Sequence, residues 1–355
     1  MKTKKLLVAM ALALGLPAGA QAAISFDPDG AGPLGAIDMA AMDWTQTSML
    51  AINGTTAIEN CLNGSCSSPE SQFDLLLQST LVATSDSSSQ INTPTGLNET
   101  FEITMVARFT ETVTAIFTQP NSVTAFFETV ASAGGYLEFY FDTTPDSDPL
   151  TGSGYSDGRL ILLATDIGTS TGSFTITTLN GVPVLSTLDL ANDDDYGSGE
   201  QLTVTGSGNN GNIDVSNVTS DPTFFLADPS TISLNFNNIS QGLPFIQVDP
   251  SDCFTDNQSG VGVGNISAGE CAFVHTDGAY AVQGADGQGG YVPNILGVNG
   301  LTPVQGGGPD EVFQTDFNTA INGQTVPEPG SLALLGLGLG LAALVGRRRP
   351  DPLGV

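Results

Sequence analysis

The sequence predicts an all-β fold, an antiparallel β-sandwich-like body with long loops rich in Gly, Asn and Asp. Three observations predict it. Apolar and polar residues alternate in short segments, turn-forming residues separate these segments, and no helical period of convincing length appears between residues 23 and 325. Asn180-Gly181 lies between two candidate strands and is a strong hairpin signal.

The alternation is clearest in residues 101–109, where apolar side chains occupy the odd positions. Val113, Ala115 and Phe117 keep that parity, so we expect one long half-buried strand with all of these side chains on its buried face. A similar segment covers residues 136–141. The other candidate strands are 159–165, 173–179, 182–190, 201–205, 212–218, 231–236 and 244–248.

Residues 1–22 have the three parts of a secretory signal peptide. Lysines come first, an apolar run covers residues 6–16, and Ala20-Gln21-Ala22 fits the small-x-small cleavage pattern with Ala20 and Ala22 as the small residues. The apolar run is too short to cross a bilayer. We expect export and a mature chain that begins near Ala23.

Two regions follow before the C-terminal tail. Residues 23–282 are expected to form the β-rich extracellular body. Residues 283–325 contain dense glycine clusters and are expected to form a Gly-rich loop or stalk region.

The C-terminal tail, residues 326–355, combines three features that bear on membrane sorting. The expected span of sixteen residues would reach about 24 Å as a helix, slightly less than a hydrocarbon core of about 30 Å. Basic residues after the span hold that end in the cytoplasm, which places the body outside. A plain C-terminal anchor is the alternative. In order, the features are Pro327-Glu328-Pro329, an apolar span over residues 331–346, and Arg347-Arg348-Arg349.

This order of Pro-Glu-Pro, apolar span and arginine cluster resembles the PEP-CTERM sorting signal. The resemblance implies a Gram-negative host that makes exopolysaccharide, and processing by a membrane enzyme, an exosortase, at or near Pro327-Glu328-Pro329. It implies transient anchoring in the inner membrane through the C-terminal helix, followed by release to the cell surface or extracellular matrix. Residues 350–355, after the arginines, depart from the usual pattern.

A second resemblance concerns the body. The segment from Phe26 to Trp44, which contains Asp27-Pro28-Asp29-Gly30, is similar to the start of flocculation-associated PEP-CTERM proteins. Residues 152–162 and 313–318 also resemble that group. The resemblance implies that the protein binds cells and exopolysaccharide into flocs or biofilm, and it brings no catalytic residues.

The charge of the chain limits the classes of partner that it can bind. The sequence has 37 acidic and 8 basic residues, a formal net charge of −29, and only Arg108 and Arg159 are basic between Ala23 and Gly346. Phosphate backbones and anionic lipid surfaces bind through clustered Lys and Arg, so nucleic acid is excluded as a partner and anionic lipid is disfavoured. Cations are the natural counterpart, although an acidic surface also serves solubility alone.

The four cysteines occur as Cys61 with Cys66 and as Cys253 with Cys271. An exported protein meets oxidising conditions, so disulfides are expected, and three connectivities are open. We favour the two local pairs because Asn63-Gly64 would form a tight turn between the first two cysteines. Zinc is the weaker alternative, since neither pair has C-x₂-C spacing.

Clusters of aspartate suggest where calcium could bind, since Ca²⁺ takes carboxylate and carbonyl oxygens from turns. One candidate is Asp27 with Asp29. The other is Asp142, Asp146 and Asp148, with Asp157 on the same loop region. The alternative is that these residues are solvated turn residues. No other cofactor is expected.

No constellation in the sequence indicates an enzyme. His275 is the only His, and it follows an apolar segment typical of a strand. Trp44 is expected in the core, whereas Tyr136, Tyr140, Tyr280 and Tyr291 would stack on sugar rings if they were exposed. The leading hypothesis is a non-enzymatic matrix protein. The alternatives are a secreted carbohydrate-active enzyme that uses an Asp/Glu pair and a calcium-dependent adhesin.

Overall fold

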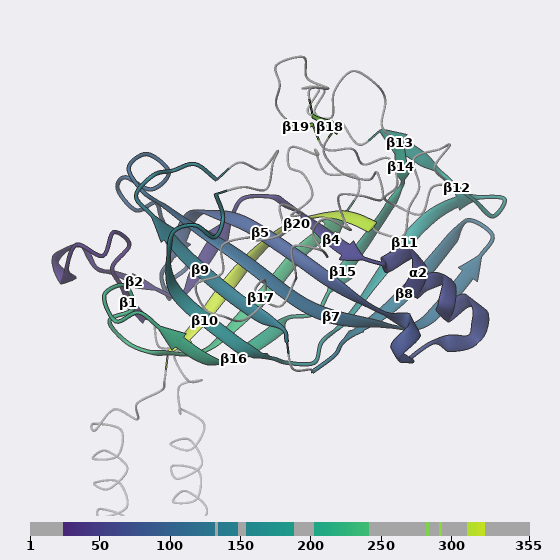
Figure 1. Cartoon of the computed structure of the whole chain (residues 1–355), viewed down its shortest axis with the longest axis horizontal. Coiled ribbons are helices and arrows are strands. Elements are labelled where there is room, and N and C mark those ends of the chain that lie inside the picture. Colours follow the sequence, from purple (N-terminus) through teal and green to yellow (C-terminus); the bar gives the residue numbers. More distant parts are fainter. Residues whose placement is uncertain are drawn as a thin grey trace, which may run out of the picture. The chain divides into compact units, whose positions relative to one another are not determined.

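Four long antiparallel strands organise the fold of the computed structural model (Figure 1). They are β5 (Gln72–Ser85), β7 (Glu102–Gln119), β17 (Pro229–Ser240) and β20 (Glu311–Gly323). The structure describes residues 24–131, 134–147, 154–187, 202–240, 282–283, 291–292 and 311–323. The chain divides into two units, residues 1–323 and 324–355, and all described residues lie in the first.

Each long strand has different partners along its length, so the sheet closes on itself twice. Near one end the closed order is β5–β7–β9–β10–β16–β17–β20–β3, and β3 pairs again with β5. The short strands of this circuit are β3 (Ala41–Trp44), β9 (Tyr136–Asp142), β10 (Arg159–Ile167) and β16 (Ile213–Ser220).

Near the other end the closed order is β5–β7–β8–β11–β15–β17–β20–β4, and β4 pairs again with β5. Closure matters because it leaves no unpaired edge along the long strands. The short strands of this circuit are β4 (Thr47–Ile52), β8 (Ser122–Thr129), β11 (Thr171–Leu179) and β15 (Gly206–Asn210).

Smaller elements complete the described structure. The helical segments are η1 (Pro33–Gly35), α2 (Gly54–Asn60), η2 (Cys61–Ser65) and η3 (Pro69–Ser71). The remaining strands are β1 (Ile24–Phe26), β2 (Ile37–Met39), β6 (Ile91–Asn92), β12 (Val182–Pro183), β13 (Leu185–Thr187), β14 (Leu202–Val204), β18 (Val282–Gln283) and β19 (Tyr291–Val292).

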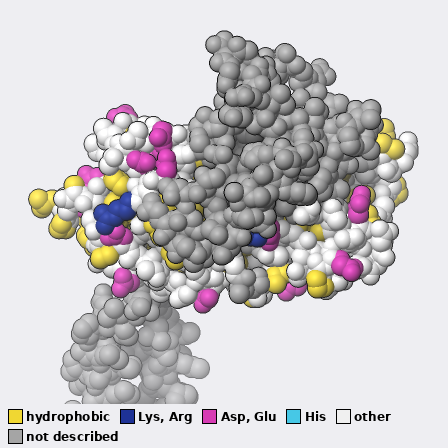
Figure 2. Space-filling view, viewed as in Figure 1, with side chains coloured by type: hydrophobic (Ala, Val, Ile, Leu, Met, Phe, Trp, Pro, Cys, Tyr) yellow, Lys and Arg dark blue, Asp and Glu magenta, His cyan; other side chains and the backbone are white. Residues whose placement is uncertain are grey.

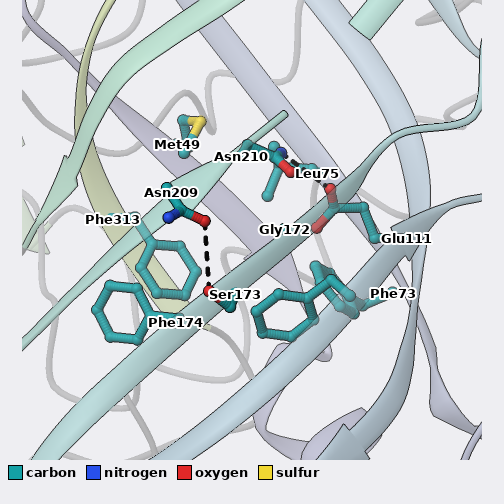
Figure 3. Close-up of a pocket in the computed structure, with 11 residues that line it drawn as sticks. Met49, Phe73, Leu75, Glu111, Gly172, Ser173, Phe174, Asn209, Asn210 and Phe313 are labelled. Atoms are coloured by element: carbon teal, nitrogen blue, oxygen red, sulfur yellow. Dashed lines mark hydrogen bonds between the residues drawn. The ribbon is translucent and has the colours of Figure 1, made fainter. Parts of the chain in front are cut away.

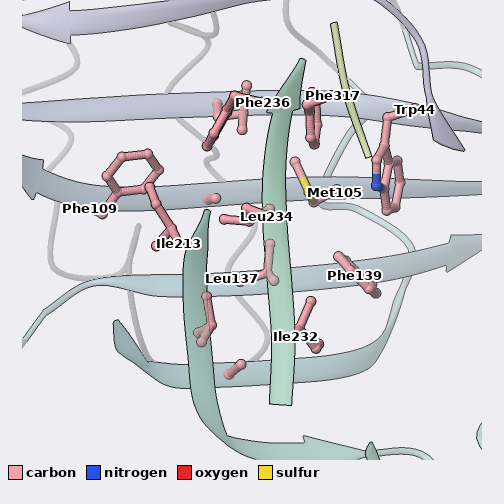
Figure 4. Packing of buried hydrophobic residues seen from close by; sticks show 14 of the residues in the cluster. Trp44, Met105, Phe109, Leu137, Phe139, Ile213, Ile232, Leu234, Phe236 and Phe317 are labelled. Atoms are coloured by element: carbon pink, nitrogen blue, oxygen red, sulfur yellow. The ribbon is translucent and has the colours of Figure 1, made fainter. Parts of the chain in front are cut away.

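Apolar side chains from opposite walls of the closed sheet pack against one another (Figure 4). The Trp44 ring lies 5.1 Å from Phe139 and 6.3 Å from Phe317, and Phe317 lies 5.7 Å from Phe236. Because β3 and β9 are not neighbours in the sheet, the first of these contacts crosses the interior. The indole nitrogen of Trp44 donates a hydrogen bond of 3.1 Å to Thr319 Oγ1, so its polar group is satisfied inside the core.

The predicted fold class is therefore confirmed: the body is all-β and antiparallel, and its walls pack face to face as in a sandwich. The hairpin at Asn180-Gly181 is also confirmed, since Leu179 pairs with Val182 across it. Both turn residues have positive φ, 54° and 79°, which is the backbone that Asn and Gly tolerate best. Trp44 is buried, as expected.

The expectation that odd-numbered side chains of the long strand face the interior is wrong after Val113. Up to that point the odd residues face inward and are buried, including Phe109 and Val113. A β-bulge then lies between Val113 and Ala115, so one extra residue of β7 opposes β8. Because a shift of one residue reverses the faces of a strand, Phe117 points outward and is 60% exposed.

The structure places the last part of the predicted stalk region, residues 311–323, in the sheet as β20. Inward-facing Phe313, Phe317 and Ile321 are buried there at intervals of four, an even spacing that keeps one face of a strand. The adjoining glycine clusters mask this pattern in the sequence. The candidate strand 244–248 lies outside the described residues.

Replacing Phe317 by alanine tests the packing of the interior. We expect the free energy of unfolding to fall by about 3–5 kcal/mol, because the ring is fully buried between Trp44 and Phe236. Urea unfolding followed by the fluorescence of Trp44, the only tryptophan, measures this loss. The control is Phe117→Ala, whose exposed ring should change stability by no more than about 0.5 kcal/mol. Equal losses in the two variants would contradict the arrangement.

Candidate functional site

The first candidate site is a small cavity between the walls of the sheet at the end that carries β8 and β11 (Figure 3). Its volume is about 30 Å³, which is room for about one water molecule. Aromatic and aliphatic side chains make up most of its lining. Residues that line it are Met49, Phe73, Leu75, Glu111, Phe127, Gly172, Ser173, Phe174, Asn209, Asn210 and Phe313.

Glu111 is the acidic residue of this lining, and it is 4% exposed. Burial raises the pKa of Glu111 to about 7, and the hydrogen bond of 3.1 Å that Asn210 Nδ2 donates to its Oε1 opposes the rise. Nearby, Ser173 Oγ donates to Asn209 Oδ1 at 3.3 Å. A single carboxyl group in so small a space can hold a proton but cannot enclose a sugar ring between two carboxylates.

The second candidate site lies at the opposite end, around the loop that joins β9 to β10. Figure 2 shows acidic side chains at this end of the molecule, where β1 and β2 lie. Carboxylate oxygens of Asp142, Asp146 and Asp157 all lie within 4.8 Å of one another. The structure thus brings together two members of the predicted set and adds Asp157, which the sequence placed on the same loop region. Asp148 lies outside the described residues.

Glu102 of β7 holds the loop that carries Asp146. Its carboxylate accepts hydrogen bonds from the backbone N–H groups of Asp146 and Ser147, both at 3.0 Å, and from Ser147 Oγ at 2.5 Å. Burial raises the pKa of Glu102 despite these bonds. The loop is therefore fixed against the outer face of β7, which the alternation pattern alone would leave to solvent.

Asp27 and Asp29 lie in the turn after β1. Asp27 is fully buried, and its Oδ2 accepts a hydrogen bond of 2.8 Å from the N–H of Gly32. Its Oδ1 is buried without a hydrogen-bond partner. Asp29 is exposed, and its Oδ1 accepts a hydrogen bond of 2.9 Å from Ala31 N–H. Burial and then the neighbouring Asp29 carboxylate raise the pKa of Asp27.

A cavity of about 480 Å³ connects these two acidic groups of residues, since Asp29, Asp142 and Asp157 all line it. Arg159 also lines it, and its guanidinium forms an ion pair with Asp221 and lies 5.4 Å from the centre of the Phe224 ring. Burial alone would raise the pKa of Asp221, but the hydrogen bonds from Thr223 and then the Arg159 guanidinium lower it on balance. The cavity is thus lined by three carboxylates and one cation that is already paired.

The cysteine prediction is confirmed where the structure describes it. Cys61 and Cys66 form a disulfide, and the turn between them contains Gly64 with a φ of 100°, which glycine adopts without strain. Closing so short a loop adds about 2 kcal/mol of stability. Cys253 and Cys271 lie outside the described residues.

The candidate sugar-stacking residues of the body are buried. Trp44, Tyr136 and Tyr140 are at most 2% exposed, so they cannot meet a polymer. Tyr280, the side chain of Tyr291 and His275 lie outside the part of the chain that the structure describes. The exposed aromatic pair is instead Phe117 and Phe126, 60% and 38% exposed, with ring centres 5.5 Å apart.

Sequence reasoning missed this pair because the bulge in β7 is invisible to a period of two. Thr114, on the bulge, hydrogen-bonds through its hydroxyl to Phe126 O at 3.2 Å. The usable signal is the segment from Thr112 to Thr118, in which every residue except Ala115 is β-branched or aromatic. Such a segment indicates a strand but does not show which of its side chains face the core.

A family model for the PEP-CTERM protein-sorting motif matches residues 325–349. The chain carries a PEP-CTERM sorting motif. This motif indicates an exported protein that an exosortase processes, delivered to the cell envelope or surface. No match was found among the curated proteins or among the solved structures.

The residues predicted to act in sorting lie outside the described structure: Ala20 and Ala22 before it, and Pro327-Glu328-Pro329 with Arg347-Arg348-Arg349 after it. The predicted span over residues 331–346 lies there too. Within residues 24–323, where described, no helix is long and apolar enough to cross a membrane.

The raised pKa of Glu111 makes a pH-dependent prediction. The unfolded chain loses this proton near pH 4.5 and the folded protein near pH 7, so raising the pH through this window favours the unfolded state. Between pH 4.5 and pH 7, the free energy of unfolding of the wild type should fall by about 3 kcal/mol relative to that of Glu111→Gln. Chemical unfolding at a series of pH values measures the difference. The control is Glu128→Gln, an exposed site on β8. Parallel curves for wild type and Glu111→Gln would contradict the burial.

Proposed function

We propose that this exported protein is a non-enzymatic component of the extracellular matrix that associates with exopolysaccharide and supports flocculation or biofilm formation. The observation that carries the proposal is the sorting motif at residues 325–349, because it marks the chain for exosortase processing during export. The similarity of the Phe26–Trp44 segment to flocculation-associated proteins supports the finer assignment.

Processing near Pro327-Glu328-Pro329 would separate the body from its membrane span. Proline disfavours the interior of a helix, so a segment with two prolines is a suitable place for a protease to act. Until cleavage, the span over residues 331–346 and the arginines at 347–349 hold the chain in the inner membrane. After cleavage the body would be held by the matrix.

The charge of the body constrains the polymer that it can meet. Both arginines of the body are already paired, Arg108 with Asp74 at 2.6 Å and Arg159 with Asp221. An anionic polymer would find no free cationic cluster among the described residues, and the excess of carboxylates would repel it. The partner is therefore a neutral polysaccharide or one that is bridged through cations.

A polar outer face with two exposed aromatic rings supports contact with sugars. We call it the outer-face patch. It comprises Phe117 on β7, Thr124 and Phe126 on β8, and Ser173 and Thr175 on β11, which are partners across these strands. The two threonine hydroxyls hydrogen-bond each other at 2.9 Å. Aromatic rings pack against the apolar C–H face of a sugar ring, and neighbouring hydroxyls and amides exchange hydrogen bonds with its hydroxyl groups.

The enzyme alternative has less support. Of the described acids, Glu111 has the pKa best suited to proton transfer near neutral pH, but its cavity of about 30 Å³ has no second carboxyl group in its lining. Glycoside hydrolysis needs a carboxyl pair that flanks the scissile bond. Incubating the full-length protein with the host polysaccharide and measuring chain length separates the two functions, since shortened chains would contradict the matrix role.

Deleting the sorting tail tests the proposed sorting and surface retention of the protein. A strain that makes the protein without residues 327–355 should lose its surface retention and its flocculation, because nothing else in the chain is expected to direct processing. Immunoblots of cell, matrix and medium fractions follow the protein, and settling assays follow flocculation. Deleting residues 350–355, which lie beyond the matched motif, is the control and should change neither. A strain that flocculates normally without the tail would overturn the proposal.

Replacing Phe117 and Phe126 together by alanine tests the outer-face patch. We expect binding to the host exopolysaccharide to weaken by roughly tenfold, which corresponds to about 1.4 kcal/mol. Co-sedimentation with the purified polymer measures it, and unfolding curves should remain unchanged within about 0.5 kcal/mol because both rings are on the surface. Ile91→Ala, at another exposed apolar side chain, is the matched control. Undiminished binding in the double variant would remove this patch from the proposal.

A further inference from the structure

The turn after β1 contains a carboxylate that is buried without a partner. Asp27 is 0% exposed, and only its Oδ2 is satisfied, by the N–H of Gly32. Its Oδ1 has no hydrogen-bond partner of ordinary geometry. The backbone N–H and the carboxyl group of Asp29 lie beside the Asp27 carboxyl group. A buried acceptor without a partner is costly, most of all when it carries charge, and such atoms in native structures are usually met by water, a proton or an ion.

The group next to this oxygen is a second carboxylate, that of Asp29. Both Oδ1 atoms face Gly35, lying 3.8 Å and 4.0 Å from the position that a Cβ would occupy there. Two carboxylates side by side repel each other unless something positive lies between them. Because Gly35 has no side chain, no Cβ packs against either oxygen.

We propose that Asp27 and Asp29 hold a calcium ion in this turn. The donors are hard oxygens without nitrogen or sulfur, which suits Ca²⁺ and excludes the metals that prefer His or Cys. A flexible turn can add backbone carbonyls and water to reach the six to eight oxygens that Ca²⁺ takes. Magnesium would demand a tighter octahedron and keeps more of its own water.

The surroundings favour a cation at this place. Asp29 lines the same cavity as Asp142 and Asp157, so two further carboxylates of the neighbouring loops raise the local concentration of cations. Arg159 on the same cavity is already paired with Asp221 and does not reach a described carboxylate of the turn. The Asp142, Asp146 and Asp157 cluster adds negative charge but contains no buried oxygen without a partner.

An ion here would stabilise the N-terminal segment of the described chain. The N–H of Asp27 donates to Phe224 O at 2.8 Å, and Leu226 N–H donates to Ser25 O at 2.9 Å. The turn therefore fastens β1 to the segment that follows β16. This role is independent of exopolysaccharide binding and would hold whatever the body binds.

The test compares the melting temperature of the full-length protein in chelator and in added CaCl₂, with calorimetric titration of CaCl₂ alone. Calcium should raise the melting temperature of the wild type, since an ion bound only to the folded state stabilises it. Asp27→Asn should weaken calcium binding by roughly tenfold or more and abolish the shift. Asp29→Asn, at an exposed position that tolerates the change, should have the same effect. It serves as the second variant in case Asp27→Asn folds poorly. Asp38→Asn on β2 is the matched control, and it should keep the shift.

Three results would overturn the assignment. The first is that the wild type shows no calcium response. If Asp27→Asn is then also more stable than the wild type at neutral pH, the two carboxyl groups share a proton instead. The response could persist in Asp27→Asn and disappear in Asp142→Asn, which moves the ion to the other cluster. Magnesium could match calcium in affinity and in melting shift, which removes the selectivity for Ca²⁺.

Discussion

The pairing of β20 with β17 on one side and with β3 and β4 on the other closes the sheet, and the rest of the body depends on it. Without β20, the strands on both sides would present unpaired backbone groups along an edge. Closure also turns one face of every long strand toward a common interior. There Phe236, Phe317 and Trp44 of the neighbouring strands β17, β20 and β3 pack side by side, and Trp44 contacts Phe139 across the interior.

Closure also explains why the two ends of the body differ. The long strands change partners midway, so each end is completed by its own short strands and loops. One end has an apolar interior whose buried acid, Glu111, keeps its proton near neutral pH. At the other end, loops carry Asp29, Asp142 and Asp157 to the lining of one cavity. The buried acid and the acidic cavity thus lie at opposite ends of the long strands.

The scarcity of basic residues gives this body an unusual electrostatic character. Described carboxylates far outnumber the two arginines, so several of them accept hydrogen bonds from backbone N–H groups or hydroxyls instead of pairing with a cation. Glu102 is satisfied by the loop that it holds, whereas Asp27 keeps one oxygen without a donor. In an exported protein such excess charge keeps the chain soluble and leaves divalent cations as the natural complement.

The sequence by itself determined the features that depend on neighbouring residues: the all-β class from local alternation, the hairpin from Asn180-Gly181, the Cys61–Cys66 disulfide, and the sorting motif at residues 325–349. Only the tertiary structure decided what depends on partners far along the chain. It placed residues 311–323 in the sheet, although glycine clusters suggested a stalk. It reversed the face of Phe117 through one extra residue opposite β8, and it buried Asp27 against the distant segment that contains Phe224 while Asp29 stayed exposed. Local patterns record which residues prefer water, whereas long-range pairing decides which of them can reach it.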